Sequence, residues 1–276
     1  MTQDFNRTAF RELILSIMTE GEVVSPRGYE IREMRNTTMV VDPQYPFQGF
    51  MARKYNVNYF IEEMRWMLRA SRFDDSIKSH AKMWESVQNQ DKSFNSNYGT
   101  FWFGPQMGLM KAAMELLRDR DSRRAVVPML RDEHLAPEMN DVVCTEAMTF
   151  LIRNSELHLT VHMRSSDVIF GVGTDVPTFS VAMLLVYGLI RANYPDLRLG
   201  KLTLQVVSSH LYSRHYDMAS RILQEPPTLY NYYDRLMPPD SCEALQIIAD
   251  RGKIKDHFKA PSHWNLYELL YRKTSE

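Results

Sequence analysis

One stretch of the chain, residues 140–180, carries three kinds of side chain that could act together in covalent chemistry. The thiol of Cys144 stands at the start of an apolar run and is a candidate nucleophile. A second apolar run ends in MRSSD (163–167), where Arg164 is a candidate clamp for an anion. A glycine-bearing segment then delivers Asp175, a carboxylate that could hydrogen-bond the edge of a ring. This spacing predicts a pocket with a nucleophile, an anion clamp and a carboxylate that reads a base.

Two of these residues also have an ordinary structural interpretation. A buried lone cysteine such as Cys144 is usually an inert core residue. Asp175 precedes a predicted helix that begins near Thr178, where an aspartate commonly caps the helix. Taken in isolation, the structural interpretation is the commoner one for both residues.

A further carboxylate, Glu63, lies in a predicted helix over residues 57–68. It borders the apolar stripe, three residues after Phe60 and four before Met67. It is either a rim glutamate that reaches water or a partly desolvated carboxylate with a raised pKa, suited to proton transfer. The spacing alone favours the rim glutamate.

The elements that must position these residues follow from hydrophobic periodicity and turn residues. Asn6 is expected to cap a first helix that ends at Gly21. Asn154-Ser155 predicts a tight hairpin. The other predicted elements are an extended segment over 29–41, a helix over 106–118 whose core face is Met107, Met110, Met114 and Leu117, strands over 125–129, 141–153, 156–164 and 201–209, and helices over 178–192 and 240–251. Without a repeat or linker, the expected fold class is α+β, one domain over residues 1–276.

Composition excludes several classes of protein. A net charge of -1 over 276 residues gives no long-range field for nucleic acid or a membrane surface. Cys144 and Cys242 lack metal-ligand spacing, so no metal is expected and a reducing compartment is the simpler interpretation. The chain shows no signal peptide and no apolar run near the roughly 20 residues that span a bilayer. We therefore expect a cytoplasmic protein.

The motifs together resemble a known family. NSNYG (95–99), DSRR (121–124), a cysteine at a strand start, MRSSD (163–167) and SSHLYSRH (208–215) occur in the order found in the thymidylate synthase family, in its phage deoxycytidylate hydroxymethylase branch above all. The resemblance covers roughly residues 57–223. It implies a large mixed β-sheet flanked by helices and a sheet-to-sheet homodimer. A phage-encoded protein of this kind would work in the host cytoplasm.

The resemblance also implies a reaction. Cys144 would attack C6 of a pyrimidine nucleotide, and C5 would then take a one-carbon unit from the cosubstrate 5,10-methylenetetrahydrofolate. Arg164 and Ser165 would hold the phosphate. Two adjacent arginines in an extended segment point to opposite faces, and the resemblance resolves this by assigning Arg123 and Arg124 to the phosphate of the other subunit.

The remaining roles also come from the resemblance. Glu63 would organise water and proton transfer at the base. Tyr98 would stand beside the thiol, and Arg27 would be a further phosphate arginine. His210 and Tyr212 would contact the sugar 3′-hydroxyl. Trp84 and Asp167 would lie near the folate.

Asp175 indicates the base. Uracil offers an N3–H donor and an O4 acceptor, which match the asparagine that typical thymidylate synthases carry here. Cytosine offers an N3 acceptor and an N4 amino donor, which match a neutral carboxylic acid or a carboxylate facing a protonated N3. The sequence therefore implies a cytosine nucleotide, dCMP.

Two departures from the family's pattern indicate which product the reaction gives. Thr145 stands where thymidylate synthases typically have histidine, and the C-terminal residues 271–276 lack an apolar tail. Both fit a wetter site, hence 5-hydroxymethyl-dCMP and tetrahydrofolate. The alternatives are a dCMP or CMP C5 methyltransferase that releases dihydrofolate, and a catalytically inactive nucleotide- or RNA-binding relative.

Overall fold

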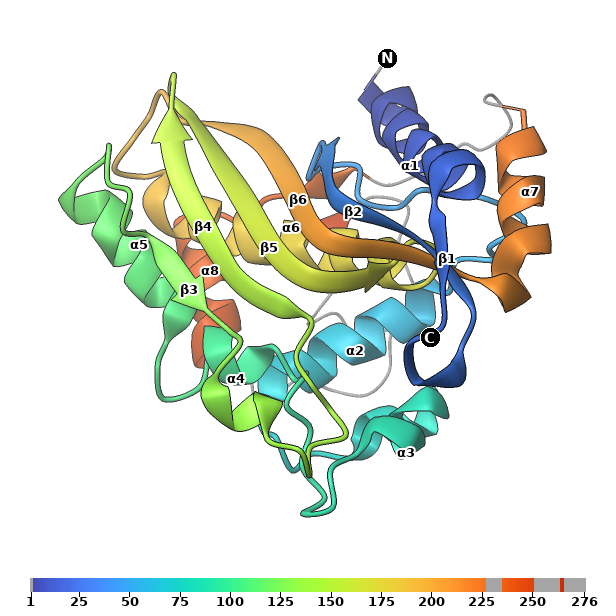
Figure 1. Ribbon diagram of the computed structural model, residues 1–276. Helices are drawn as coiled ribbons and strands as arrows, with labels where there is room; N and C mark the ends of the chain where they lie inside the picture. The colour runs from blue at the N-terminus through green and yellow to red at the C-terminus, as the bar shows by residue number, and fades with distance from the viewer. Residues whose placement is uncertain (1, 227–234, 251–263, 266–276) are drawn as a thin grey trace, which may run out of the picture.

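A six-stranded mixed sheet forms the centre of the protein, seen in a computed structural model that describes residues 2–226, 235–250 and 264–265 (Figure 1). The strand order is β1-β2-β6-β5-β4-β3. β5 and β6 run parallel and every other neighbouring pair is antiparallel. The strands are β1 (Glu22–Val24), β2 (Ile31–Val41), β3 (Val126–Pro128), β4 (Thr145–Arg153), β5 (Glu156–Asp167) and β6 (Arg198–Tyr212). The predicted mixed sheet is confirmed.

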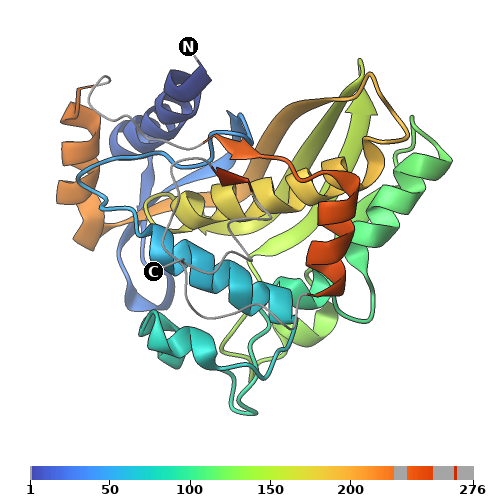
Figure 2. The ribbon, with the colours of Figure 1, turned by 180° about the vertical axis from the view of Figure 1, so that it is seen from behind.

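Helices cover one face of this sheet (Figure 2). The long helix α6 lies against the sheet, and α2 and α8 lie beside α6. α5 packs on α6 and β3, while α1 packs on β2 and α7. The helices are α1 (Thr2–Glu20), α2 (Val57–Arg69), α3 (Met83–Val87), α4 (Gly99–Trp102), α5 (Gly108–Arg118), α6 (Gly171–Ile190), α7 (Tyr216–Gln224) and α8 (Ser241–Ala249); β7 (Leu236–Met237) and β8 (Trp264–Asn265) form a separate parallel pair.

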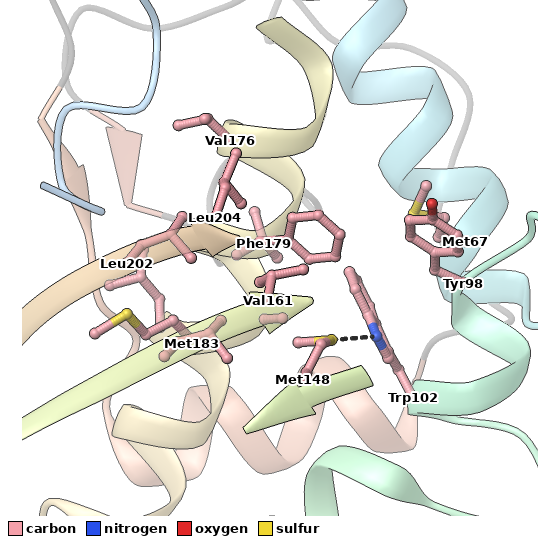
Figure 3. Close-up of a cluster of buried hydrophobic side chains, with 14 of the residues drawn as sticks. Met67, Tyr98, Trp102, Met148, Val161, Val176, Phe179, Met183, Leu202 and Leu204 are labelled. Carbon is pink, nitrogen blue, oxygen red and sulfur yellow. Dashed lines mark hydrogen bonds between the residues drawn. The ribbon is translucent and has the colours of Figure 1, made fainter. Parts of the chain in front are cut away.

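The core lies between α6 and the sheet (Figure 3). Phe179 and Met183 of α6 meet Leu202 and Leu204 of β6 there, because alternate strand residues point to one face. α6 is long and apolar enough to cross a membrane, contrary to the expectation that no such run exists, yet most of it is buried inside the protein. It is the core helix of a globular domain.

The other face of β4, β5 and β6 is not covered by any helix in the described part of the chain, and Figure 1 looks onto it. Its side chains are partly or fully exposed, with Val207 51% exposed. They include Thr149, Leu151, His158, Thr160, His162, Gln205 and Val207. Apolar and uncharged polar groups fill the middle of this face, while charged side chains (Arg153, Glu156 and Lys201) occupy the same alternating positions at one end of the strands.

Several local predictions are confirmed. The helix expected over 57–68 is α2, capped by the Asn56 side chain. Asn154 and Ser155, with φ values of 51° and 57°, join β4 to β5. Positive φ at both central residues is the conformation that matches the twist of a two-residue hairpin.

Two local predictions are wrong. Asn6 does not begin a helix; it lies inside α1, buried, and its side chain bonds the backbone of Asp42 and Tyr45. The expected methionine face of α5 is largely outside, since Met114 is 61% exposed. Residues beside that stripe, Leu109, Ala112, Ala113 and Leu116, are buried instead. Alanines on that side let α5 approach α6 closely, which periodicity of large side chains does not reveal.

Candidate active site

Cys144 and Arg164 are held together by the pairing of β4 with β5. Arg164 N donates to the Cys144 carbonyl at 2.9 Å. The Arg164 guanidinium donates to the carbonyls of Val143 and Val142, at 3.0 and 2.7 Å, and lies 3.6 Å from Cys144 Sγ. These backbone contacts fix a positive charge beside the thiol.

Cys144 is half-buried. Burial raises its pKa above the ordinary value, and the negative charges of Asp175 and Asp141 act in the same direction. The positive charges of Arg164 and Arg27 oppose this and lower the pKa. Cys144 is therefore a thiol at neutral pH whose ionisation depends on nearby arginines.

Asp175 lies in the second turn of α6, neither in a loop nor at a helix cap as expected, because α6 already begins at Gly171. Ser166, at the end of β5, donates from Oγ to Asp175 Oδ2 at 3.2 Å. Burial raises the pKa of Asp175 to about 7. Near neutral pH the carboxyl exists in both forms, so it can donate a hydrogen bond as well as accept one.

Glu63 is only 5% exposed, so the rim interpretation is wrong. Tyr59, four residues earlier on α2, donates to Glu63 Oε1 at 2.7 Å. Burial, together with the negative charge of Asp175, raises the pKa of Glu63 to about 8, although the Tyr59 hydrogen bond lowers it. The protein therefore holds two carboxyl groups that interact with each other and titrate close to neutral pH.

Tyr98 belongs to the NSNYG segment and precedes α4. Its hydroxyl accepts a hydrogen bond of 3.0 Å from Thr145 Oγ1. Burial raises the pKa of Tyr98, and the charges of Asp175 and Cys144 add to this rise. The phenol therefore lies within electrostatic range of both groups and stays protonated at physiological pH.

The parallel pairing of β5 with β6 aligns further site residues. Ser165 pairs with Ser208, and Asp167 pairs with His210. Ser165 Oγ lies 3.4 Å from His210 Nδ1. The His210 ring is edge-on to Tyr212, with 5.2 Å between centroids. The structure thus brings the predicted phosphate and sugar contacts side by side.

Arg27 approaches the same region from the turn Pro26–Gly28 between β1 and β2. The residue is exposed and has a left-handed backbone, with φ of 54°. Burial lowers the pKa of His210, and the positive charge of Arg27 acts in the same direction. At Cys144 the same charge opposes the burial that raises the thiol pKa. The chain therefore places Arg27 where it can add to the charge of Arg164.

Arg123 and Arg124 are exposed and lie far from the thiol of their own chain. Val126 of β3 pairs with Thr149 of β4. Because the two strands are antiparallel, the β4 residues farther from Cys144 lie opposite the β3 residues nearer to Arg124. At about 3.3 Å per residue, the distance along β4 from Cys144 to the position opposite Arg124 is roughly 20 Å. One subunit does not bring these residues together.

The two residues assigned to the folate make local contacts. Trp84 is buried, and its Nε1 donates to the Tyr59 hydroxyl at 3.0 Å. Asp167 accepts from the backbone N–H groups of Ile169 and Phe170, at 3.0 and 3.3 Å, and so shapes the turn into α6. Their role toward a folate stays a prediction.

Sequence reasoning missed Tyr59 and Ser166, which donate hydrogen bonds to Glu63 and Asp175. The signal for Tyr59 was its spacing of four residues from Glu63, which places both side chains on one side of α2. Ser166 stands in MRSSD beside the predicted phosphate residue. No group of His, Cys, Asp and Glu able to hold a metal occurs among the described residues.

Comparison with known proteins identifies the family of this chain. The family model described as thymidylate synthase matches residues 8–234. Similar proteins include the deoxycytidylate 5-hydroxymethyltransferases of Enterobacteria phages T6 and T4, 27% and 26% identical over 211 residues, or 73% of this chain and 84% of theirs. The deoxyuridylate hydroxymethyltransferase of Bacillus phage SP01 is 23% identical over 63% of this chain and 50% of its own. The chain belongs to the thymidylate synthase family.

Proposed function

We propose that the protein converts dCMP and 5,10-methylenetetrahydrofolate to 5-hydroxymethyl-dCMP and tetrahydrofolate. The observation that carries the proposal is Asp175, a carboxyl group with a pKa of about 7 that interacts electrostatically with Cys144. Such a group can donate to cytosine N3 and accept from the N4 amino group. The relatives that act on deoxycytidylate and on deoxyuridylate are both hydroxymethyltransferases, so the base must be argued from this residue.

In this proposal Cys144 adds to C6 as the thiolate, which makes C5 nucleophilic. C5 attacks the folate's methylene carbon, whose bond to N10 breaks as the bond to C5 forms. Loss of the C5 proton then breaks the bond from that carbon to N5, which releases tetrahydrofolate and leaves an exocyclic methylene. Water adds its hydroxyl to this methylene and Cys144 leaves C6 as the thiolate, so the protons lost from C5 and from water balance those that N5 and N10 gain. Arg164, 3.6 Å from the sulfur, stabilises that thiolate at both ends of the sequence.

Two carboxyl groups can serve the proton transfers that this chemistry requires. Glu63, with a pKa of about 8, and Asp175, with a pKa of about 7, interact with each other electrostatically. A general acid or base works best when its pKa lies near the working pH. We assign Glu63 to the water and protons at the base, and Asp175 to recognition of N3 and N4.

The water-capture step of the proposal rests on the sequence departure at Thr145, a side chain that is itself fully buried. Its hydroxyl donates to Tyr98, so a small hydrogen-bonded side chain follows the nucleophile. The polar C-terminal residues 271–276, the second reason to expect a wet site, lie outside the described residues. A methyltransferase that releases dihydrofolate is the alternative that a product assay separates.

The proposal includes a homodimer in the cytoplasm, formed through the uncovered face of the sheet. The phosphate role assigned to Arg123 and Arg124 calls for a second chain, because both lie far from Cys144 within one subunit. Each subunit would lend these arginines to the phosphate of the other, where Arg27, Arg164 and Ser165 already gather. His210 and Tyr212 would bind the sugar.

The test is a product assay with dCMP and methylenetetrahydrofolate, read by nucleotide mass and by absorbance of dihydrofolate. A hydroxymethyl product without a dihydrofolate signal supports the proposal. A methyl product with rising dihydrofolate would make the enzyme a methyltransferase. Turnover of dUMP or CMP, but not of dCMP, would overturn the assigned nucleotide, and no turnover of any of them would favour an inactive nucleotide-binding relative.

A further inference from the structure

A chain of hydrogen bonds connects Trp84 to Glu63 through Tyr59. Trp84 Nε1 lies 3.0 Å from the Tyr59 hydroxyl, and that hydroxyl lies 2.7 Å from Glu63 Oε1. Trp84 and Glu63 are buried, with 6% and 5% of their surfaces exposed. The first bond joins α3 to α2, and the second lies within α2. The charge of Asp175 also acts on Glu63.

The direction of this chain follows from the donors available. An indole N–H can only donate, so the Tyr59 oxygen accepts from Trp84. The single phenolic proton is then directed to Glu63 Oε1, which must accept. Glu63 Oε2 is buried and has no hydrogen-bond partner among the described residues.

We propose that Tyr59 is a positioning residue that, oriented by Trp84, holds Glu63 Oε1 as an acceptor and reserves Oε2 as the atom that carries and exchanges the proton. This inference rests on the proposed function for its link to catalysis. In that reaction the inference assigns Oε2 to the water and protons at the base. A buried oxygen without a protein partner is suited to this, because it gains a hydrogen bond when ligand or water arrives.

The groups around Tyr59 and Glu63 determine in which direction the pKa of Glu63 should shift when Tyr59 is changed. The hydrogen bond from Tyr59 lowers the pKa of Glu63, whereas burial and the charge of Asp175 raise it. Tyr59 itself has a pKa raised by burial and then by Glu63, with a smaller effect of Tyr55. Tyr59 therefore stays a donor throughout the range in which Glu63 titrates, and its loss removes a bond that favours the ionised carboxylate.

The test compares Tyr59→Phe with the wild type, using the infrared carbonyl band of the protonated carboxyl group. Subtracting the spectra of Glu63→Gln isolates the titration of Glu63. We expect Tyr59→Phe to move this pKa upward by about one pH unit, as a lost bond to a charged group should. In the pH profile of kcat/KM for dCMP, the apparent pKa assigned to Glu63 should rise by the same amount, while KM changes little.

Two further variants make the result specific. Trp84→Phe keeps the Tyr59 hydroxyl but removes the donor that orients it, so it should give a smaller shift in the same direction. Tyr187→Phe is the matched control, because this buried hydroxyl donates to the Leu197 carbonyl at 3.0 Å, and we expect no shift. An unmoved Glu63 pKa in folded Tyr59→Phe and Trp84→Phe overturns the inference. If the wild type does not turn over dCMP, the proposed function fails, whereas the infrared titration still decides the role of Tyr59.

Discussion

Ser166 donates a hydrogen bond of 3.2 Å to Asp175, and this bond ties the end of β5 to the second turn of α6. Because Ser166 occupies Oδ2, the orientation of the Asp175 carboxyl is fixed before a nucleotide arrives. Gly171 is close to the same pair: a Cβ there would lie 3.1 Å from Ser166 Oγ. The carboxyl group that we propose reads the base thus takes its geometry from the junction of strand and helix.

Asp175→Asn should change the preferred base. An amide at this position offers the donor and acceptor that match uracil, and it leaves cytosine with mismatched groups in a desolvated site. We expect the ratio of kcat/KM for dCMP to that for dUMP to fall by at least about a hundredfold. Steady-state kinetics with both nucleotides measure this ratio. Retained preference for dCMP in Asp175→Asn would show that another residue reads the base.

Arg164→Gln should make the Cys144 thiol less reactive. The arginine lowers the pKa of Cys144 against the effect of burial, so its loss raises that pKa and decreases the thiolate fraction. At pH 8 we expect alkylation of Cys144 by iodoacetamide to slow by roughly tenfold, which corresponds to about one pH unit.

The measurement has an internal reference. Cys242 is exposed and free, so peptide mass spectrometry follows both cysteines in one sample. Its alkylation rate should be the same in wild type and Arg164→Gln. Equal Cys144 rates in the two proteins would show that the guanidinium does not control the thiol.

Glu63→Gln should remove a pH-dependent penalty on stability. The pKa of Glu63 rises from an ordinary 4.5 to about 8 in the folded protein. The folded state therefore keeps a proton that the unfolded state has released, and the free energy of unfolding falls as pH rises through this window. We expect Glu63→Gln to gain on the order of 3 kcal/mol relative to wild type between pH 5 and pH 8.5.

Urea unfolding at several pH values measures this difference. The gain should grow steadily across the window and level off above pH 8. Asp175→Asn should show a similar gain in the free energy of unfolding as pH rises. That gain should level off near pH 7, because the pKa of Asp175 rises from 3.8 to about 7 in the folded protein. A constant difference between wild type and Glu63→Gln at all pH values would contradict the buried-carboxyl account.

Mixed dimers should reveal whether the site is shared. The variant Arg123→Gln/Arg124→Gln retains the thiol, whereas Cys144→Ser retains both arginines. If the arginines act across the interface, random mixing should restore up to about a quarter of wild-type activity, because half of the dimers are mixed and each has one complete site. Activity is measured after the two variants are co-expressed or unfolded and refolded together.

A matched pair provides the control. Arg164 lies 3.6 Å from Cys144 in the same chain. Mixing Arg164→Gln with Cys144→Ser should therefore restore nothing, because neither site in a mixed dimer is complete. Restoration in this control pair, or its absence in the first pair, would argue against arginines shared between subunits.

The sequence by itself determined the elements and the order of the motifs. Alternating apolar residues define β4, β5 and β6, and Asn154-Ser155 supplies the positive φ values of their hairpin. These are local properties, since backbone conformation and side-chain period are fixed within a few residues. The same is true of α2, with its apolar stripe and Asn56 cap.

Only the tertiary structure decided what each polar residue contacts. Glu63 sits at the margin of its helical stripe, yet other elements cover it and raise its pKa to about 8. Asp175 precedes no helix but lies within one, where Ser166 reaches it from a strand. Burial and through-space hydrogen bonds depend on segments distant in the chain, so spacing in the sequence could name these carboxylates but not their protonation.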